Sequence, residues 1–220
     1  MTDLRPAPAS PAAGLRERKK RRTRDALLRA ALLLFIAQGY EQTTVDEITD
    51  AVDVSQRTFF RYFANKEEVA FTVQDIVESH FLAELRARPA SEGPMEAMRN
   101  AVLAGWDTVE EAISEVVPVD LYMRGYQLIE STPALLAVHL RRSTELEEEI
   151  SRLIAAREGL DLDLDPRPRV VVAAFSGVMR VTGRLWGQGQ DASVAAIRRM
   201  TEAYLDQIGP ALAADWRRPA

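Results

Sequence analysis

The sequence predicts an all-helical protein, with a small N-terminal helix-turn-helix head followed by a larger helical body. Three observations support this fold class. Apolar residues recur at intervals of three and four along most of the chain, Pro or Gly stands at most of the breaks, and no window shows convincing strand alternation. This periodicity predicts about nine helices. With 220 residues, of which 47% are hydrophobic, the chain can bury one good core or two small ones.

Composition and charge narrow the functional classes. The chain has no cysteine, which excludes disulfides and thiolate chemistry. It has neither an apolar run long enough to span a membrane nor an N-terminal signal core, so we expect a cytoplasmic protein without membrane partners. The net charge of −5 is unevenly placed, because residues 1–66 hold twelve Lys/Arg against eight Asp/Glu. Since phosphate binding needs only a local basic face, this asymmetry favours a DNA-binding head on an acidic body.

The N-terminal region combines a tail, a basic run and a first helix. Residues 1–15 are rich in Pro and Ala and are expected to be disordered. Residues 16–24 hold seven basic side chains, which form either the solvated start of a helix or an arm that contacts DNA phosphates or the minor groove. From Asp25 an apolar rhythm predicts a helix that ends at Gly39.

Two short helical patterns then flank a tight turn. Thr44 precedes an apolar rhythm as an N-cap does, Asp53 interrupts that rhythm, and Ser55 can cap the next helix. This next helix spans only about two turns and exposes a polar, cationic N-terminal end that includes Gln56 and Arg57. A short helix of this kind, braced by the helix before it, is typical of a helix-turn-helix whose second helix enters the major groove.

A family resemblance rests on an ordered set of residues in this region: Thr44, Val45, Ile48, Val54, Ser55, Thr58, Phe59, Phe60, Tyr62, Phe63, Lys66 and Glu67. The pattern resembles the N-terminal domain of the TetR family of bacterial transcriptional regulators, over roughly residues 20–70. The turn commonly carries Gly where this chain has Asp53, which tolerates the left-handed conformation better than most residues. Thr49 stands where Ala is common, and Phe60 lacks the hydroxyl of the usual Tyr.

The resemblance and the helix-turn-helix pattern together define candidate DNA contacts. Gln56 and Arg57 suit adenine and guanine through paired hydrogen bonds, while Lys66 is expected to bind phosphate together with Thr44 and Tyr62. The full candidate set is Thr44, Ser55, Gln56, Arg57, Thr58, Phe60, Arg61, Tyr62 and Lys66.

The body begins with a long helix from Lys66 that ends before Pro89, and residues 91–94 form a linker. Apolar spacing and the Pro and Gly breaks predict the remaining helices at 95–113, 118–131, 133–158, 167–187 and 191–209. The predicted domains are therefore a tail (1–15), a DNA-binding head (16–66), a ligand-binding and dimerisation body (67–213) and a C-terminal tail (214–220).

Apolar residues cover more than half the circumference of the predicted helix 167–187, which is too much for a helix at a simple monomer surface. In proteins of the TetR family the last two long helices pair with those of a second subunit, so the resemblance implies a homodimer. The expected interface residues are Val170, Ala174, Val178, Val181, Leu185, Met200 and Tyr204.

The middle of the body is expected to hold a ligand cavity. Its candidate lining residues combine large apolar surfaces with a few polar groups, although aromatic and Met residues at helical spacing more often form the core. They are Trp106, Tyr122, Met123, Tyr126, His139, Phe175 and Met179. The segment 128–150 and the residues after it are similar to the C-terminal domain of an actinobacterial TetR subgroup that includes the regulator of mycofactocin systems. That similarity implies an acyl-CoA-like effector.

Enzymatic and metal sites are not predicted. Asp161, Asp163 and Asp165 alternate as in a calcium loop, but Pro166 and Val172 occupy the positions that need Gly and Glu. Neither histidine lies in a metal-binding pattern, no phosphate-binding loop or nucleophile elbow is present, and no cofactor is expected.

The sequence therefore predicts a ligand-responsive repressor that binds a palindromic DNA operator as a homodimer and is released by a small apolar or acyl-type effector. An activator, or a regulator without a ligand, is an alternative that a filled body would favour. An all-helical enzyme is a second alternative, which a metal or cofactor bound in the body would support.

Overall fold

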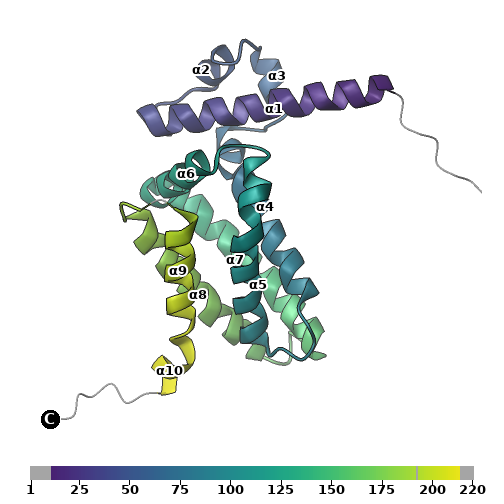
Figure 1. The fold of residues 1–220 in the computed structure, drawn as a ribbon, viewed down its shortest axis with the longest axis vertical. Coiled ribbons are helices and arrows are strands. Elements are labelled where there is room, and N and C mark those ends of the chain that lie inside the picture. Colours follow the sequence, from purple (N-terminus) through teal and green to yellow (C-terminus); the bar gives the residue numbers. More distant parts are fainter. Residues whose placement is uncertain (1–10, 192, 214–220) are drawn as a thin grey trace, which may run out of the picture. The chain divides into compact units, whose positions relative to one another are not determined.

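The computed structural model describes residues 11–191 and 193–213, and within these ranges the chain forms ten helices and no strand (Figure 1). The predicted all-helical fold is confirmed. The chain divides into two compact units, Met1–Ala70 and Phe71–Ala220, which we call the head and the body. The boundary between them lies within helix α4 (Lys66–Ala87).

The head contains α1 (Pro11–Gln38), α2 (Val45–Asp50), α3 (Gln56–Phe60) and the start of α4. Helix α1 begins earlier than expected, so residues 11–15 are helical instead of belonging to a disordered tail, while residues 1–10 of that predicted tail lie outside the described residues. The basic run 16–24 forms part of α1, which matches the helical interpretation of this segment. Apolar side chains from all four helices meet in the core of the head: Leu27, Leu28, Ala31, Phe35, Ile48, Phe59, Phe63 and Val69.

The turn between α2 and α3 contains the only described non-glycine residue with a positive φ. Asp53 has a φ of 54°, as the sequence predicts for a residue that replaces the usual Gly. The amide of Val54 donates to the carbonyl of Thr49 at 3.1 Å, and that of Asp53 donates to the carbonyl of Asp50 at 3.2 Å. These two bonds form a Schellman motif, which satisfies the last carbonyls of α2 and directs the chain into α3.

The body contains the remainder of α4, α5 (Pro94–Ser114), α6 (Val119–Ser131), α7 (Pro133–Glu158) and α8 (Arg167–Gly187), followed by α9 (Val194–Leu205) and α10 (Ile208–Ala213). Proline at the first turn starts α5, α7 and α8, and a left-handed Gly159 ends α7. The predicted helix 191–209 is wrong, because Ser193 caps a later start and the chain breaks again after Leu205. The predicted tail 214–220 lies outside the described residues.

Helix α8 packs against α5, α6, α7 and α9. Two glycines allow α6 to approach it closely. A Cβ placed on Gly183 would lie 2.9 Å from the hydroxyl of Tyr126, and one placed on Gly187 would lie 2.9 Å from Cβ of Glu130. The absence of side chains at these two positions therefore fixes where α6 lies on α8.

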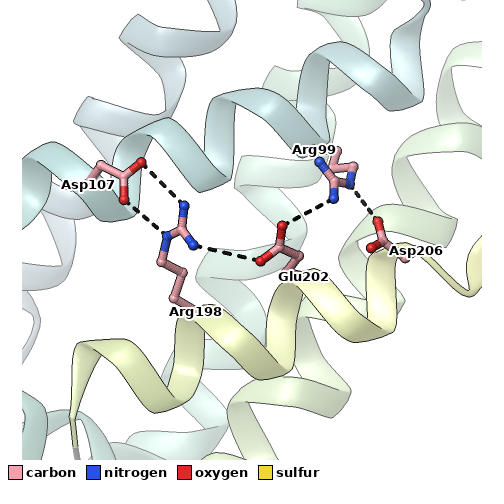
Figure 2. A network of polar contacts seen from close by, with 5 residues as sticks. All are labelled: Arg99, Asp107, Arg198, Glu202 and Asp206. Atoms are coloured by element: carbon pink, nitrogen blue, oxygen red, sulfur yellow. Dashed lines mark hydrogen bonds and ion pairs between the residues drawn. The ribbon is translucent and has the colours of Figure 1, made fainter.

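An alternating row of charges joins α5 to α9 (Figure 2). Arg99 donates from Nε to Asp206 at 2.7 Å, and its guanidinium also contacts Glu202. Arg198 lies between the same Glu202 and Asp107 of α5, to which its Nε donates at 3.1 Å. Single exposed ion pairs contribute little to stability, but a connected row fixes the register of two helices more effectively.

Candidate DNA-binding helix and ligand cavity

The N-terminal end of α3 presents its side chains outward from a capped turn. The hydroxyl of Ser55 accepts from the amide of Thr58 at 3.3 Å, and the two hydroxyls are hydrogen-bonded at 3.1 Å. Buried Phe59 holds the opposite side of this short helix in the core of the head. Arg57 is exposed and makes no hydrogen bond or ion pair with a described residue, so its guanidinium is free to meet a base edge.

Two neighbouring side chains already have partners. The amide nitrogen of Gln56 donates to the carboxylate of Asp46 on α2. Arg61 donates to the hydroxyl of Tyr62 at 3.1 Å, and its guanidinium lies 4.8 Å from the centre of the Tyr62 ring. Gln56 must therefore exchange its contact with Asp46 before it can bind a base.

Thr44 and Phe60 are two further members of the candidate DNA-binding set. Thr44 caps α2 in a capping box with Glu47, and the backbone amide of Thr44 is the main cause of the lowered pKa of the Glu47 carboxyl. The hydroxyl of Thr44 also donates to Glu47 at 3.1 Å. The Phe60 ring is 53% exposed, which leaves an apolar surface suited to a thymine methyl or a sugar.

Lys66, which the sequence predicts to bind phosphate, contacts backbone carbonyls of the head in the structure. Its ammonium nitrogen donates to the carbonyls of Tyr40 at 2.8 Å, Thr43 at 3.0 Å and Glu41 at 3.2 Å, and lies 4.4 Å from the centre of the Tyr40 ring. Because an ammonium has three protons, all of them are used within the head. Lys66 therefore fastens the loop between α1 and α2 to the start of α4.

The body encloses a cavity of about 140 Å³. Helices α4 to α9 all contribute to its lining, and Tyr122 and Tyr126, four residues apart on α6, both reach it. Six of the seven predicted ligand residues line the cavity: Trp106, Tyr122, Tyr126, His139, Phe175 and Met179. The seventh, Met123, is buried but is not among the lining residues, because it lies about 100° around α6 from Tyr122.

Sequence reasoning missed the contribution of α4 to the cavity. Gln74, Val77, Glu78 and Phe81 recur at helical spacing and line one wall. The polar members of this group interrupt the apolar stripe of α4, and this interruption is the sequence feature that could have indicated a polar cavity wall. On a helix such residues usually belong to a solvated face, so they were not singled out.

Parallel aromatic rings form much of the wall. Tyr122 and Tyr126 stack at 6.4 Å with an interplanar angle of 14°, and Phe81 and Phe175 stack at 5.8 Å and 11°. Behind the lining, Tyr126 also stacks on Trp186 at 5.4 Å. Two pairs of parallel aromatic rings therefore belong to the lining of the cavity.

Three buried polar groups, Glu78, His139 and Trp106, line the cavity. Burial raises the pKa of Glu78, although Arg142, 4.0 Å away, opposes that shift. Burial likewise lowers the pKa of His139, whose Nε2 lies 3.5 Å from Glu130. Among the described residues, neither Nδ1 of His139 nor Nε1 of Trp106 has a hydrogen-bond partner.

The apolar face predicted for dimerisation lies on the solvent-facing side of α8 and α9. Val170 is 66% exposed, Leu185 and Tyr204 are also classed as exposed, and the remaining members, Ala174, Val178, Val181 and Met200, are partly exposed. The opposite side of α8 is buried and carries Val172, Phe175, Thr182 and Trp186. Helix α8 is thus apolar on both sides, only one of which contributes to the core of the body.

Other kinds of site are not apparent in the part of the chain that the structure describes. No group of three His, Asp or Glu side chains there is arranged to hold a metal ion. None of the described helices has the length and apolar character needed to cross a membrane.

Comparison with known proteins agrees with the two units. The family of bacterial regulatory proteins named tetR matches residues 27–73, and the MftR C-terminal domain matches residues 92–213. Both resemblances expected from the sequence are therefore confirmed.

Individual relatives show the same relationship. The HTH-type transcriptional regulator TcmR of Streptomyces glaucescens is 52% identical over 206 residues, which cover 94% of this chain and 91% of TcmR. The HTH-type transcriptional repressor NicS of Pseudomonas putida is 30% identical over 95 residues, covering 43% of this chain and 45% of NicS. A crystal structure of a transcriptional regulator from Aquifex aeolicus VF5 has the same fold, with a TM-score of 0.54 at 13% identity, over 84% of this chain and 99% of that one. The chain therefore belongs to the TetR family of bacterial transcriptional regulators, a family of DNA-binding proteins and not of enzymes.

Proposed function

We propose that the protein is a repressor that binds a palindromic operator as a homodimer and releases it when a small molecule occupies the cavity of the body. The observation that carries the DNA-binding part is the exposed, unpaired Arg57 at the capped start of α3. The name of NicS, a repressor that matches 43% of this chain, supports the direction of regulation. Operator binding also implies a cytoplasmic location.

In this proposal, α3 reads the major groove. Arg57 suits the paired acceptors of guanine, and Gln56 suits adenine once it leaves Asp46. The hydroxyl groups of Thr44 and Tyr62 suit phosphate oxygens. Lys66 takes no part in DNA binding.

The second apolar side of α8 supports the proposed pairing of two subunits. A row of apolar side chains from Val170 to Leu185, together with Met200 and Tyr204 of α9, would be covered by the same face of a second copy. The two heads would then read half-sites about 34–36 Å apart.

Release by an effector requires only that the ligand bind one conformation of the body better than another. A tenfold change in operator affinity needs about 1.4 kcal/mol of differential binding. The cavity lies among six helices, including α8 and α9 of the proposed interface, so its occupancy can alter how the subunits pair. Such a cavity also argues against a regulator without a ligand, which would have a filled body.

A binding assay on an operator recovered from the organism's genome tests the DNA-reading part. Arg57→Ala should weaken binding by about 1–3 kcal/mol and relax the preference at one base pair in each half-site. Arg86→Ala removes another exposed cation, one that belongs to the body, and should leave the operator affinity and the base preference unchanged. If Arg57→Ala retained the full base preference, the assignment of Arg57 as the base-reading residue would be wrong.

A further inference from the structure

The structure also bears on the chemistry of the effector. We propose that the cavity binds an uncharged ring compound that offers a hydrogen-bond acceptor to Trp106 and a hydrogen-bond donor to Glu78, and that it disfavours anionic acyl compounds. This inference rests on the proposed function, since it specifies the ligand of the same cavity.

Trp106 supplies the donor. Its side chain lines the cavity and is 8% exposed, and its indole Nε1 has no hydrogen-bond partner among the described residues. An indole N–H can only donate, and leaving a buried donor unpaired is costly. A carbonyl or ether oxygen of a ligand would satisfy it.

Glu78 and His139 supply the acceptors. The Glu78 side chain lines the cavity, and its nearest cation, Arg142, is shared with Asp75. Burial lowers the pKa of His139 and so favours its neutral form, in which a proton on Nε2 facing Glu130 would leave Nδ1 as an unpaired acceptor. Both groups therefore suit a hydroxyl or amino hydrogen of a ligand.

The charges of the lining disfavour an anion. Arg180 is the only Lys or Arg among the described lining residues, and it is already paired with Glu147, which also lines the cavity. Glu78, which contacts Gln74 and shares Arg142 with Asp75, then remains as the acid of the lining that has no cation of its own. An anionic ligand would lose its hydration beside a carboxylate and find no free cation in return.

The walls favour a flat ring. The stacked pairs Tyr122–Tyr126 and Phe81–Phe175 line the cavity, and aromatic rings suit packing against a planar ligand. Gly105 lines the cavity one residue before Trp106, and a Cβ placed there would meet nothing within 4 Å. Open space therefore adjoins position 105, the residue before Trp106.

Three coumarins that share one ring system test the proposal on the full-length protein. Umbelliferone has a hydroxyl donor and a carbonyl acceptor, coumarin has only the acceptor, and coumarin carboxylate adds a negative charge. In calorimetric titration at mildly acidic pH, where umbelliferone is uncharged, umbelliferone should bind most tightly. Coumarin should bind about threefold to tenfold more weakly, because one hydrogen bond is lost, and the carboxylate more weakly still.

Matched variants locate the contacts. Trp106→Phe keeps a ring but removes the N–H, and should weaken umbelliferone binding by about threefold to tenfold. Trp186→Phe makes the same change at another unpaired indole that does not line the cavity, and should leave binding unchanged. Glu78→Gln should reduce the preference for umbelliferone over the carboxylate.

The ligand series on the unaltered protein decides the proposal even if a variant fails to fold. Tighter binding of the carboxylate or of decanoyl-CoA than of umbelliferone would overturn it, as would the absence of binding by all the uncharged probes. The proposed function is judged separately by operator binding. If decanoyl-CoA alone released the operator, the proposed function would stand and this inference would fail. If the protein preferred umbelliferone but bound no operator, this inference would stand and the proposed function would fail.

Discussion

At the residue scale, Asp53 shows how one backbone angle supports the DNA-binding surface. Its φ of 54° is costly for most side chains and free for glycine. Asp53→Gly should therefore leave thermal stability unchanged or raise it, whereas Asp53→Val should lower it by about 1–2 kcal/mol. Thermal unfolding of both variants checks this, and equal stability of Gly and Val at this position would show that the turn is not held in the left-handed region.

Lys66 offers a second prediction at this scale, because its two candidate roles have different consequences. Lys66 donates to three carbonyls, two of them in part-buried hydrogen bonds, so Lys66→Met should lower stability by about 1–3 kcal/mol because these acceptors lose a charged partner. The salt dependence of operator binding should not change. If Lys66→Met reduced the slope of log affinity against log salt concentration by about one unit without loss of stability, Lys66 would instead be a phosphate contact.

Glu78 gives a prediction about pH. Burial raises the pKa of its carboxyl in the folded protein above the ordinary value of 4.5, so the folded state binds this proton more tightly than the unfolded chain does. The stability contributed by the protonated group is present below 4.5 and is lost as the pH rises through the folded pKa. Glu78→Gln should thus be more stable than the wild type near neutral pH and equal to it in acid. Denaturant unfolding at several pH values measures the difference in the free energy of unfolding between the variant and the wild type. A difference that does not change with pH would contradict a raised pKa of the Glu78 carboxyl.

The sequence predicts a site residue when the residue belongs to a local sequence pattern. It does not predict a role that depends on contacts with residues far away in the chain. Arg57 and the cap Ser55 follow from the order of residues in the head. Lys66 belongs to the same pattern, but its ammonium contacts depend on carbonyls more than twenty residues away, which no local spacing reveals. Glu78 was missed for a similar reason, since a polar residue on a helix does not show which neighbours enclose it.

At the element scale, helix ends with strong signals were predicted well. Helices α7 and α8 have the expected bounds because proline starts them and glycine ends each near the predicted position. The break between α9 and α10 carries no proline or glycine of its own, and it was missed. The Pro and Ala content of residues 11–15 was read as disorder, although alanine favours helices and Pro11 suits a first helical turn.

The close approach of α6 and α8 gives a prediction at the same scale. A Cβ on Gly187 would lie 2.9 Å from Cβ of Glu130, so Gly187→Ala should push the helices apart and destabilise the body by about 1–3 kcal/mol. Gly105→Ala provides the control, because its Cβ meets nothing and alanine favours a helix interior, so it should be neutral or stabilising by up to about 1 kcal/mol. Thermal unfolding at equal protein concentrations compares the two, and an equal response at both positions would show that α6 does not depend on the glycine.

At the scale of the whole molecule, the apolar side of α8 predicts how the protein assembles. Val178→Asp would place an unpaired charge in the proposed interface and should yield monomers in sedimentation velocity, with operator affinity lower by orders of magnitude. Ala195→Asp adds the same charge to an exposed position of α9 away from Met200 and Tyr204, and should remain dimeric. A dimeric Val178→Asp variant with normal affinity would place the interface elsewhere.

Two identical heads should read DNA together, which selection of bound sequences from a random duplex pool can measure. We expect an enriched inverted repeat whose half-sites are centred about 10–10.5 base pairs apart, bound by two protomers per duplex. A single unrepeated motif bound by one protomer, or the absence of any enriched sequence, would contradict it.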